Sequence, residues 1–114
     1  MMAKSRRGEV WLIDLNPARG HEQAGKRPAL VISVDLFNSG SAGLVVVLPV
    51  TTKDKKIPLH VKISPPEGGV KETSFVKCED IRSVSTERLL ARLGEVSKGT
   101  IAIVEDRVRI LLGL

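Results

Sequence analysis

The stretch GLVVVLPVTTKDKKIPLHVKIS, residues 43–64, contains two kinds of β-strand separated by a basic loop. Its first part, residues 43–50, is a continuous apolar run rich in valine, which is typical of a buried strand. Its last part, residues 59–64, alternates apolar and polar side chains, which indicates an antiparallel strand with one solvated face. The stretch therefore favours a mainly β fold.

Further short strands are expected on both sides of this stretch. They are bounded by Gly, Pro, Asn and Ser, and we place them at residues 8–15, 28–34 and 73–84, with a turn at residues 65–70. The segment STERLLARLG begins at Ser85, a suitable cap, and ends at Gly94. It predicts a short helical turn that leads to a last strand near residues 93–96.

The end of the chain has the pattern of an amphipathic helix. After Ser97, a suitable N-cap, apolar residues recur at helical spacing at positions 101, 104, 108, 111 and 112. The charged residues Lys98, Glu105, Asp106, Arg107 and Arg109 lie largely off this stripe and are expected to face solvent. The order of elements predicts an α+β, mainly β, fold: a curved antiparallel sheet or small barrel with short helices and a C-terminal amphipathic helix.

Composition and length limit the function classes. A chain of 114 residues with 42% apolar content suits a single domain, residues 1–114, with one core. Eighteen basic residues against thirteen acidic ones give a net charge of +5, which favours polyanionic partners. The charged N-terminal segment lacks the apolar run of a signal peptide, and no later stretch could span a bilayer, so we expect a cytoplasmic protein.

Several common kinds of active site have no support in this sequence. The two histidines, His21 and His60, are far apart and no cluster has the spacing of metal ligands, so we expect neither a metal nor a cofactor. The loop GHEQAGKR lacks P-loop spacing and leads into a strand instead of a helix. Cys78 is the only cysteine, and its context FVKCED is more typical of a strand residue than of a nucleophile.

The remaining candidate is a basic, hydroxyl-bearing group of residues in two segments. Residues 20–27 end in Arg27, and in residues 49–56 Thr51 and Thr52 are followed by three lysines. Two such loops side by side would form a groove suited to a phosphodiester. Taken singly, the same residues also fit bland alternatives: solvating lysines, a β-forming threonine and an arginine in an ion pair.

At these residues the sequence resembles the MazF/PemK/Kid family of bacterial toxins. The segment GHEQAGKRP, residues 20–28, looks like the family's G-x-E-Q-x-G-x-R-P loop, and PVTT, residues 49–52, looks like its P-x-T-T segment. CEDIRSV, residues 78–84, is similar to a stretch that often ends in Q-I-R or Q-V-K. The resemblance covers nearly the whole chain, with the motifs in the family's order.

The resemblance implies a CcdB/PemK-like fold of the SH3-like barrel type, a homodimer and a MazE-like antitoxin partner. It implies a sequence-specific endoribonuclease, an mRNA interferase, that cleaves single-stranded RNA. In such enzymes the RNA 2′-hydroxyl attacks its own phosphate, giving a 2′,3′-cyclic phosphate and a 5′-hydroxyl, without a metal. The usual catalytic residues of the family correspond here to Arg27 and Thr51.

Physical chemistry limits the roles that these residues can take. Arginine stays protonated, so Arg27 is suited to stabilise a negatively charged phosphorane and is a poor general base. Thr51 offers a stiff hydroxyl that can hold a non-bridging phosphate oxygen. The base remains open among His21, Glu22 and His60.

Two departures from the family bear on specificity: His21 stands where relatives commonly carry a small residue, and Asp80 where they often carry glutamine. With three aromatic residues in the chain, we expect RNA to be bound through cations and polar groups instead of stacking platforms. The expected RNA-binding residues are Gln23, Lys26, Thr52, Lys53, Lys55, Lys56, His60 and Arg82. Two alternatives remain open: a CcdB-like toxin that binds DNA gyrase without catalysis, and an inactive RNA-binding module.

Overall fold

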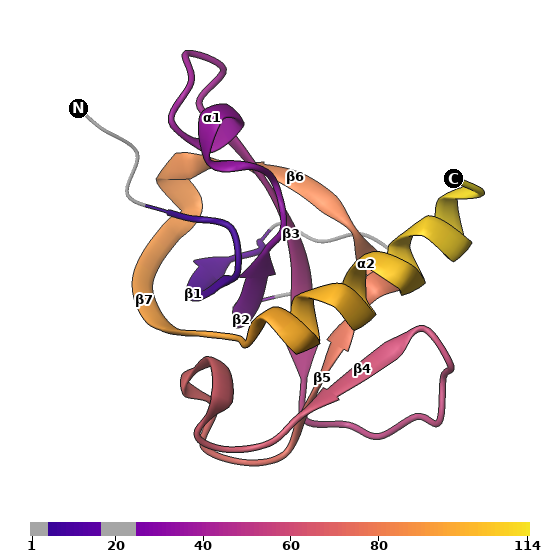
Figure 1. Cartoon of the computed structure of the whole chain (residues 1–114). Helices are drawn as coiled ribbons and strands as arrows, with labels where there is room; N and C mark the ends of the chain where they lie inside the picture. The colour runs from indigo at the N-terminus through magenta and orange to yellow at the C-terminus, as the bar shows by residue number, and fades with distance from the viewer. Residues whose placement is uncertain (1–4, 17–24) are drawn as a thin grey trace.

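A computed structural model describes residues 5–16 and 25–114 of the chain (Figure 1). Its strands are β1 (Glu9–Asp14), β2 (Lys26–Val31), β3 (Leu44–Thr51), β4 (His60–Ile63), β5 (Ser74–Lys77), β6 (Arg82–Ser85) and β7 (Leu89–Glu95). Its helices are α1 (Asp35–Asn38) and α2 (Lys98–Leu112), with 3₁₀ turns η1 (Glu67–Gly69), η2 (Cys78–Asp80) and η3 (Thr86–Arg88).

All strands join one antiparallel sheet in which β3 is the central strand. The order is β4-β5-β3-β2-β1-β7, and β6 pairs with β3 beside this path. One edge of β3 pairs with β2, while the other pairs with β6 near its start and with β5 near its end. Over the described residues β4 and β7 remain at opposite ends, so the sheet is curved and not closed into a barrel.

The buried residues form two clusters, one on each face of the sheet, instead of the single core that we expected. The helix face carries α2, which crosses the front of the sheet in Figure 1 and contributes Val104 to a cluster that includes Leu30 and Leu48. The opposite face buries Val31 and Val47, among others. Arg27 and Thr51 stand four residues from Val31 and Val47 along their strands, so their side chains leave the sheet on this second face. We call it the site face.

Most of the expected elements are confirmed, with shifts near the end of the chain. The strand expected over residues 73–84 is interrupted by η2, so that β5 and β6 pair with different parts of β3. The helical turn after Ser85 lasts only three residues, and β7 begins at Leu89 instead of near residue 93. The reason is tertiary: β1 offers a pairing edge, and Leu89 already lies opposite Ile13.

Helix α2 has the ends that the sequence predicts. The Ser97 side chain accepts a hydrogen bond from the Thr100 backbone at 3.1 Å, and Gly113 adopts the left-handed conformation at the C-terminal end. Glu67 of η1 accepts hydrogen bonds from the backbone of Ser97, at 3.0 Å, and from the hydroxyl of Thr100. None of the helices described here is long and apolar enough to cross a membrane.

Candidate functional site

The register of the sheet predicts that Arg27 and Thr51 lie close together. Strands β2 and β3 pair with Ala29 opposite Pro49 and with Val31 opposite Val47. Continuing this register by two residues places Arg27 opposite Thr51. Residues directly opposite each other in antiparallel strands have side chains on the same face, about 5 Å apart at Cβ. The continued register therefore favours a placement of the two side chains next to each other on the site face, at the ends of two central strands.

The hydroxyl of Thr51 is held by the turn that follows it. Its Oγ1 accepts a hydrogen bond from the Lys53 backbone at 3.2 Å, and the side chain is half-buried. Since the oxygen accepts from this N–H, the hydroxyl proton is directed elsewhere and can be donated to a ligand. Arg27, at the start of its strand, is exposed to solvent. The pair combines an accessible cation with a hydroxyl of restricted orientation.

The lysines of residues 52–59 differ in their environment. Lys53 and Lys55 are exposed. Lys56 lies 3.3 Å from the Asp54 carboxylate, and its backbone N–H also donates to Asp54 at 3.1 Å. This backbone hydrogen bond is the main cause that lowers the pKa of Asp54. Lys53 and Lys55 are therefore better placed than Lys56 to meet an anion.

The same row of the sheet adds two residues that sequence reasoning missed. Thr51 lies opposite Phe75 of β5, and Phe75 lies opposite Lys62 of β4. Thr51, Phe75 and Lys62 thus form one row across three strands on the site face, and the continued β2–β3 register adds Arg27 to it. The alternation of residues 59–64 already placed Lys62 on a polar face, but the pairing partners of β4 were needed to connect it with Thr51.

Two pairs of charged side chains include residues of the next row, in which His60 lies opposite Lys77. His60 Nε2 lies 2.7 Å from Glu79 Oε2, and Lys77 Nζ lies 3.6 Å from Asp80 Oδ2. His60, which we expected on a solvated face, has a side chain only 3% exposed. The structure therefore shows a buried His60 side chain paired with a half-buried Glu79.

The other predicted residues take different positions. Lys26 alternates with Arg27, so its side chain leaves the opposite face of β2. Thr52 is exposed directly after β3, and Arg82 of β6 lies opposite Val47, two rows from Thr51. His21, Glu22 and Gln23 lie outside the described residues.

Nucleophile and metal chemistry find little support in the described part of the chain. Cys78 is fully buried, and burial, together with the negative charge of Glu79, raises the pKa of its thiol to about 11. No three His, Cys, Asp or Glu side chains among residues 5–16 and 25–114 converge as metal ligands. The thiol is therefore a core side chain and is protonated at neutral pH.

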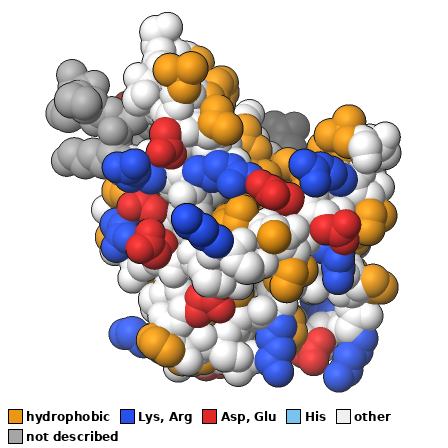
Figure 2. Space-filling model, viewed as in Figure 1, with side chains coloured by type: hydrophobic (Ala, Val, Ile, Leu, Met, Phe, Trp, Pro, Cys, Tyr) orange, Lys and Arg blue, Asp and Glu red, His pale blue; other side chains and the backbone are white. Residues whose placement is uncertain are grey.

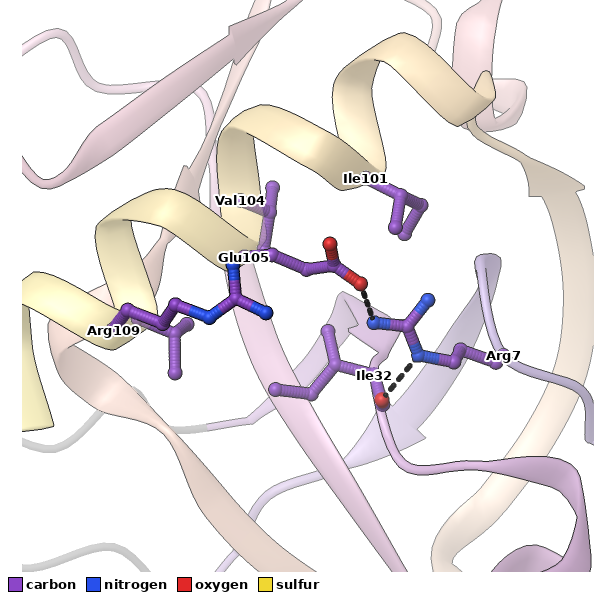
Figure 3. A pocket seen from close by; sticks show the side chains of 7 residues that line it. Arg7, Ile32, Ile101, Val104, Glu105 and Arg109 are labelled. Carbon is purple, nitrogen blue, oxygen red and sulfur yellow. Dashed lines mark hydrogen bonds and ion pairs between the residues drawn. The ribbon is translucent and has the colours of Figure 1, made fainter. Parts of the chain in front are cut away.

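A shallow pocket lies on the helix face, away from Arg27 and Thr51 (Figure 3). It measures about 200 Å³ and is lined by Ile32 and by the inner side of α2. Arg7 spans it, donating to the Ile32 carbonyl at 2.9 Å and to the Glu105 carboxylate. Figure 2 shows basic and acidic side chains interspersed over this side of the molecule. No continuous basic surface that could bind a polyanion is visible on this side.

Comparisons with known proteins agree with the motifs and the fold. The sequence pattern of the family described as "PemK-like, MazF-like toxin of type II toxin-antitoxin system" matches residues 6–112. Endoribonuclease MazF9 of Mycobacterium tuberculosis (strain ATCC 25618 / H37Rv) is 39% identical, over 96% of this chain and 97% of that protein.

Solved structures give the same answer. The crystal structure of MazF (Form-I) from Deinococcus radiodurans has a TM-score of 0.86 at 32% identity and covers 96% of this chain and 97% of that one. An endoribonuclease in complex with its cognate antitoxin, from a mycobacterial species, has a TM-score of 0.82 at 27% identity, over 97% of each chain. The chain belongs to the PemK-like, MazF-like family of toxins of type II toxin–antitoxin systems.

Proposed function

We propose that this chain is a cytoplasmic endoribonuclease toxin that cleaves single-stranded RNA at specific sequences. The single observation that supports the proposal is the β2–β3 register, which pairs Ala29 with Pro49 and, continued by two residues, sets Arg27 opposite Thr51. The name of the mycobacterial relative, an endoribonuclease 39% identical over nearly the full length, supports the reaction class. The exposed Lys53 and Lys55, beside Thr51, suit a phosphate backbone.

The proposed chemistry is transfer of the phosphate to the RNA's own 2′-oxygen. The 2′-oxygen attacks the phosphorus and loses its proton to a base, while the bond from phosphorus to the 5′-oxygen breaks. That oxygen gains a proton, and the products are a 2′,3′-cyclic phosphate and a 5′-hydroxyl. Arg27 stabilises the doubly charged phosphorane, and Thr51 donates its hydroxyl proton to a non-bridging oxygen. Such a preorganised donor is worth ~10²-fold or more in rate.

The general base is proposed from the three candidates of the sequence analysis, His21, Glu22 and His60. Of the three candidates, His60 is the one that the structure describes, and its burial against Glu79 favours a supporting role. His21 and Glu22 of the preceding loop therefore remain the proposed bases. Lys26, Thr52, Arg82, Gln23 and the loop lysines remain proposed RNA contacts.

The decisive experiment incubates the purified protein with a long mRNA in EDTA and analyses the ends of the products. Wild type is expected to leave cyclic phosphates and 5′-hydroxyls, Arg27→Ala and Thr51→Val to lose at least ~10²-fold in rate, and Thr51→Ser to retain most activity. Arg109→Ala, on the helix face, is the matched charge control. Equal cutting by all variants would reject this site, and inhibition of gyrase supercoiling without RNA cleavage would support the CcdB-like alternative.

We also propose a homodimer that a cognate antitoxin neutralises. One structural relative was solved in complex with its cognate antitoxin. The net charge of +5 suits an acidic antitoxin segment that covers the site face. Light scattering at micromolar concentration tests the dimer, and a monomeric mass would count against it.

A further inference from the structure

Arg88, which precedes β7, binds the backbone of β1 beyond the point where β7 stops. The last pair between β1 and β7 joins Ile13 to Leu89. Arg88 Nη1 donates to the carbonyl of Asp14 at 3.0 Å and to the carbonyl of Asn16. Nη1 carries two hydrogens, so one nitrogen can serve both oxygens. A side chain thus replaces the strand that is missing at this edge.

The geometry of the strand explains why two carbonyls meet one guanidinium. Backbone groups of alternate residues point to the same edge of a strand, and the Leu15 N–H points to β2, where it donates to the Gly25 carbonyl at 2.9 Å. The carbonyls of Asp14 and Asn16 therefore point to the β7 side. Arg88 supplies both carbonyls with a hydrogen-bond donor beyond the last β1–β7 pair.

The other edge of this segment holds the start of the strand that carries Arg27. Asp14 pairs with Lys26, Ile13 pairs with Arg27, and the Asn16 side chain accepts a hydrogen bond from the Gly25 N–H at 3.0 Å. A displacement of residues 14–16 therefore acts on Gly25 and Lys26, the residues directly before Arg27. Thr51, by contrast, is held on its other side by Phe75 of β5.

Arg88 is itself fixed by the turn on which it lies. Ser85 caps η3 by accepting from the Glu87 N–H at 3.2 Å, and the Thr86 N–H donates to the Gly43 carbonyl at 2.9 Å. The turn is thus tied to the segment that enters β3, the strand of Thr51. Arg88 thus links β1, which pairs with the strand of Arg27, to the segment that enters the strand of Thr51.

We infer that Arg88 is a positioning residue for RNA cleavage: it clamps the end of β1 and so sets Arg27 against Thr51. The inference rests on the proposed function of that pair. A misplacement of about 1 Å in a reacting group costs up to ~10²-fold in rate. Loss of the clamp should therefore lower kcat and leave the RNA affinity nearly unchanged, because Arg88 is directed at protein backbone.

The test compares Arg88→Met, Arg88→Lys and Arg109→Met with wild type on an oligoribonucleotide carrying a cut site mapped on the long mRNA. We expect kcat to fall roughly tenfold or more in Arg88→Met, less in Arg88→Lys, which keeps the charge and some donors, and not in Arg109→Met. KM and the salt dependence of binding should match wild type. A raised KM with a salt slope smaller by about 0.7 would mean that Arg88 binds a phosphate directly and would overturn the inference.

Amide hydrogen exchange gives a second readout that does not need activity. Exchange at Leu15 and Gly25 should accelerate in Arg88→Met, while the amide of Ile101 in α2 keeps its wild-type protection. Unchanged exchange at Leu15 and Gly25 would overturn the inference that Arg88 clamps the end of β1, even if kcat falls. If wild type fails to cleave RNA while these amides respond as expected, the proposed function fails and the clamp stands as a structural device.

Discussion

Cys78 shows how burial determines the chemistry of a single side chain. Its thiol is 0% exposed, and burial followed by the charge of Glu79 raises its pKa to about 11 from a reference value of 9.0. Only about a thousandth of the thiol is then ionised at pH 8. Because the folded-state pKa is the higher one, this group stabilises the fold below pH 9 and loses that contribution as the pH rises towards 11.

We therefore expect Cys78 to resist alkylation in the folded protein. Iodoacetamide at pH 8 should leave the intact mass unchanged over an hour, while the same treatment in guanidinium chloride should add one adduct. Stoichiometric labelling of the native protein within minutes would contradict the assignment of Cys78 to the core.

Glu9 is a buried carboxylate whose partners hold it ionised. It is 6% exposed and accepts hydrogen bonds from Arg92 Nε at 2.6 Å, Trp11 Nε1 at 3.0 Å and the Arg6 N–H at 2.7 Å. Burial alone would raise the pKa of Glu9, but these hydrogen bonds, that of Arg92 foremost, outweigh it and lower the pKa. Its stabilising contribution is present above the ordinary pKa of 4.5 and is lost as the pH falls through the lowered value.

Glu9→Gln should reduce the free energy of unfolding by about 1–3 kcal/mol at pH 7, since it removes charge-assisted bonds and leaves Arg92 with a weaker partner. The difference should shrink as the pH falls below 4.5 and through the lowered pKa of Glu9, where the wild-type carboxylate takes up a proton. Urea unfolding at a series of decreasing pH values measures this, and a difference that stays the same throughout would show that the charge of Glu9 is irrelevant.

At the scale of elements, η1 and β7 approach so closely that only glycine fits. A Cβ added to Gly94 would lie 2.6 Å from the backbone nitrogen of Gly69, and one added to Gly69 would lie 2.0 Å from the Leu93 carbonyl oxygen. Gly69 also has a φ of +72°. This contact ties the turn after β4 to the far edge strand.

Gly94→Ala should therefore destabilise the protein by about 3 kcal/mol, because two backbone segments would have to separate. Gly99→Ala is the matched control: its Cβ would meet nothing nearer than the Ser97 hydroxyl at 3.7 Å, and alanine should stabilise α2 by up to about 1 kcal/mol. Thermal unfolding of both variants is the measurement. Equal effects of the two substitutions would show that the approach of η1 to β7 is not tight in solution.

At the scale of the molecule, we expect the net charge of +5 to favour RNA binding only through the positive side chains that lie near the candidate site. Lys53 and Lys55 are exposed beside Thr51, whereas Lys98 and Arg109 belong to α2 on the helix face. The doubly substituted Lys53→Gln/Lys55→Gln should reduce the salt slope of RNA binding by about 0.7 for each phosphate that is no longer neutralised. Lys98→Gln/Arg109→Gln changes the net charge equally and should keep the wild-type slope. RNA binding is measured by fluorescence anisotropy in the Thr51→Val background, from about 50 mM to about 300 mM salt. The comparison separates direct phosphate contacts of Lys53 and Lys55 from a general effect of the net charge.

The sequence alone was sufficient to predict the features that depend on local patterns. The spacing of Ile101, Val104 and Val108 predicted α2, and the resemblance of two short motifs to the family singled out Arg27 and Thr51, whose catalytic role stays a prediction. It was insufficient where partners are distant: the start of β7 depends on Ile13, and the burial of His60 depends on Glu79. Lys62 and Arg88 reach the site through partners on other strands, and no local pattern encodes such pairings.

The position of β7 beside β1 has a consequence for synthesis of the chain. β1, residues Glu9–Asp14, receives its second partner only when Leu89–Glu95 has been made, and α2 covers the helix face later still. Pairings so distant in sequence form late in folding. The strands of Arg27 and Thr51 can pair earlier, but the clamp from Arg88 arrives with the last quarter of the chain. The candidate site of this toxin is therefore complete only near the end of translation, when the ribosome has synthesised most of the chain.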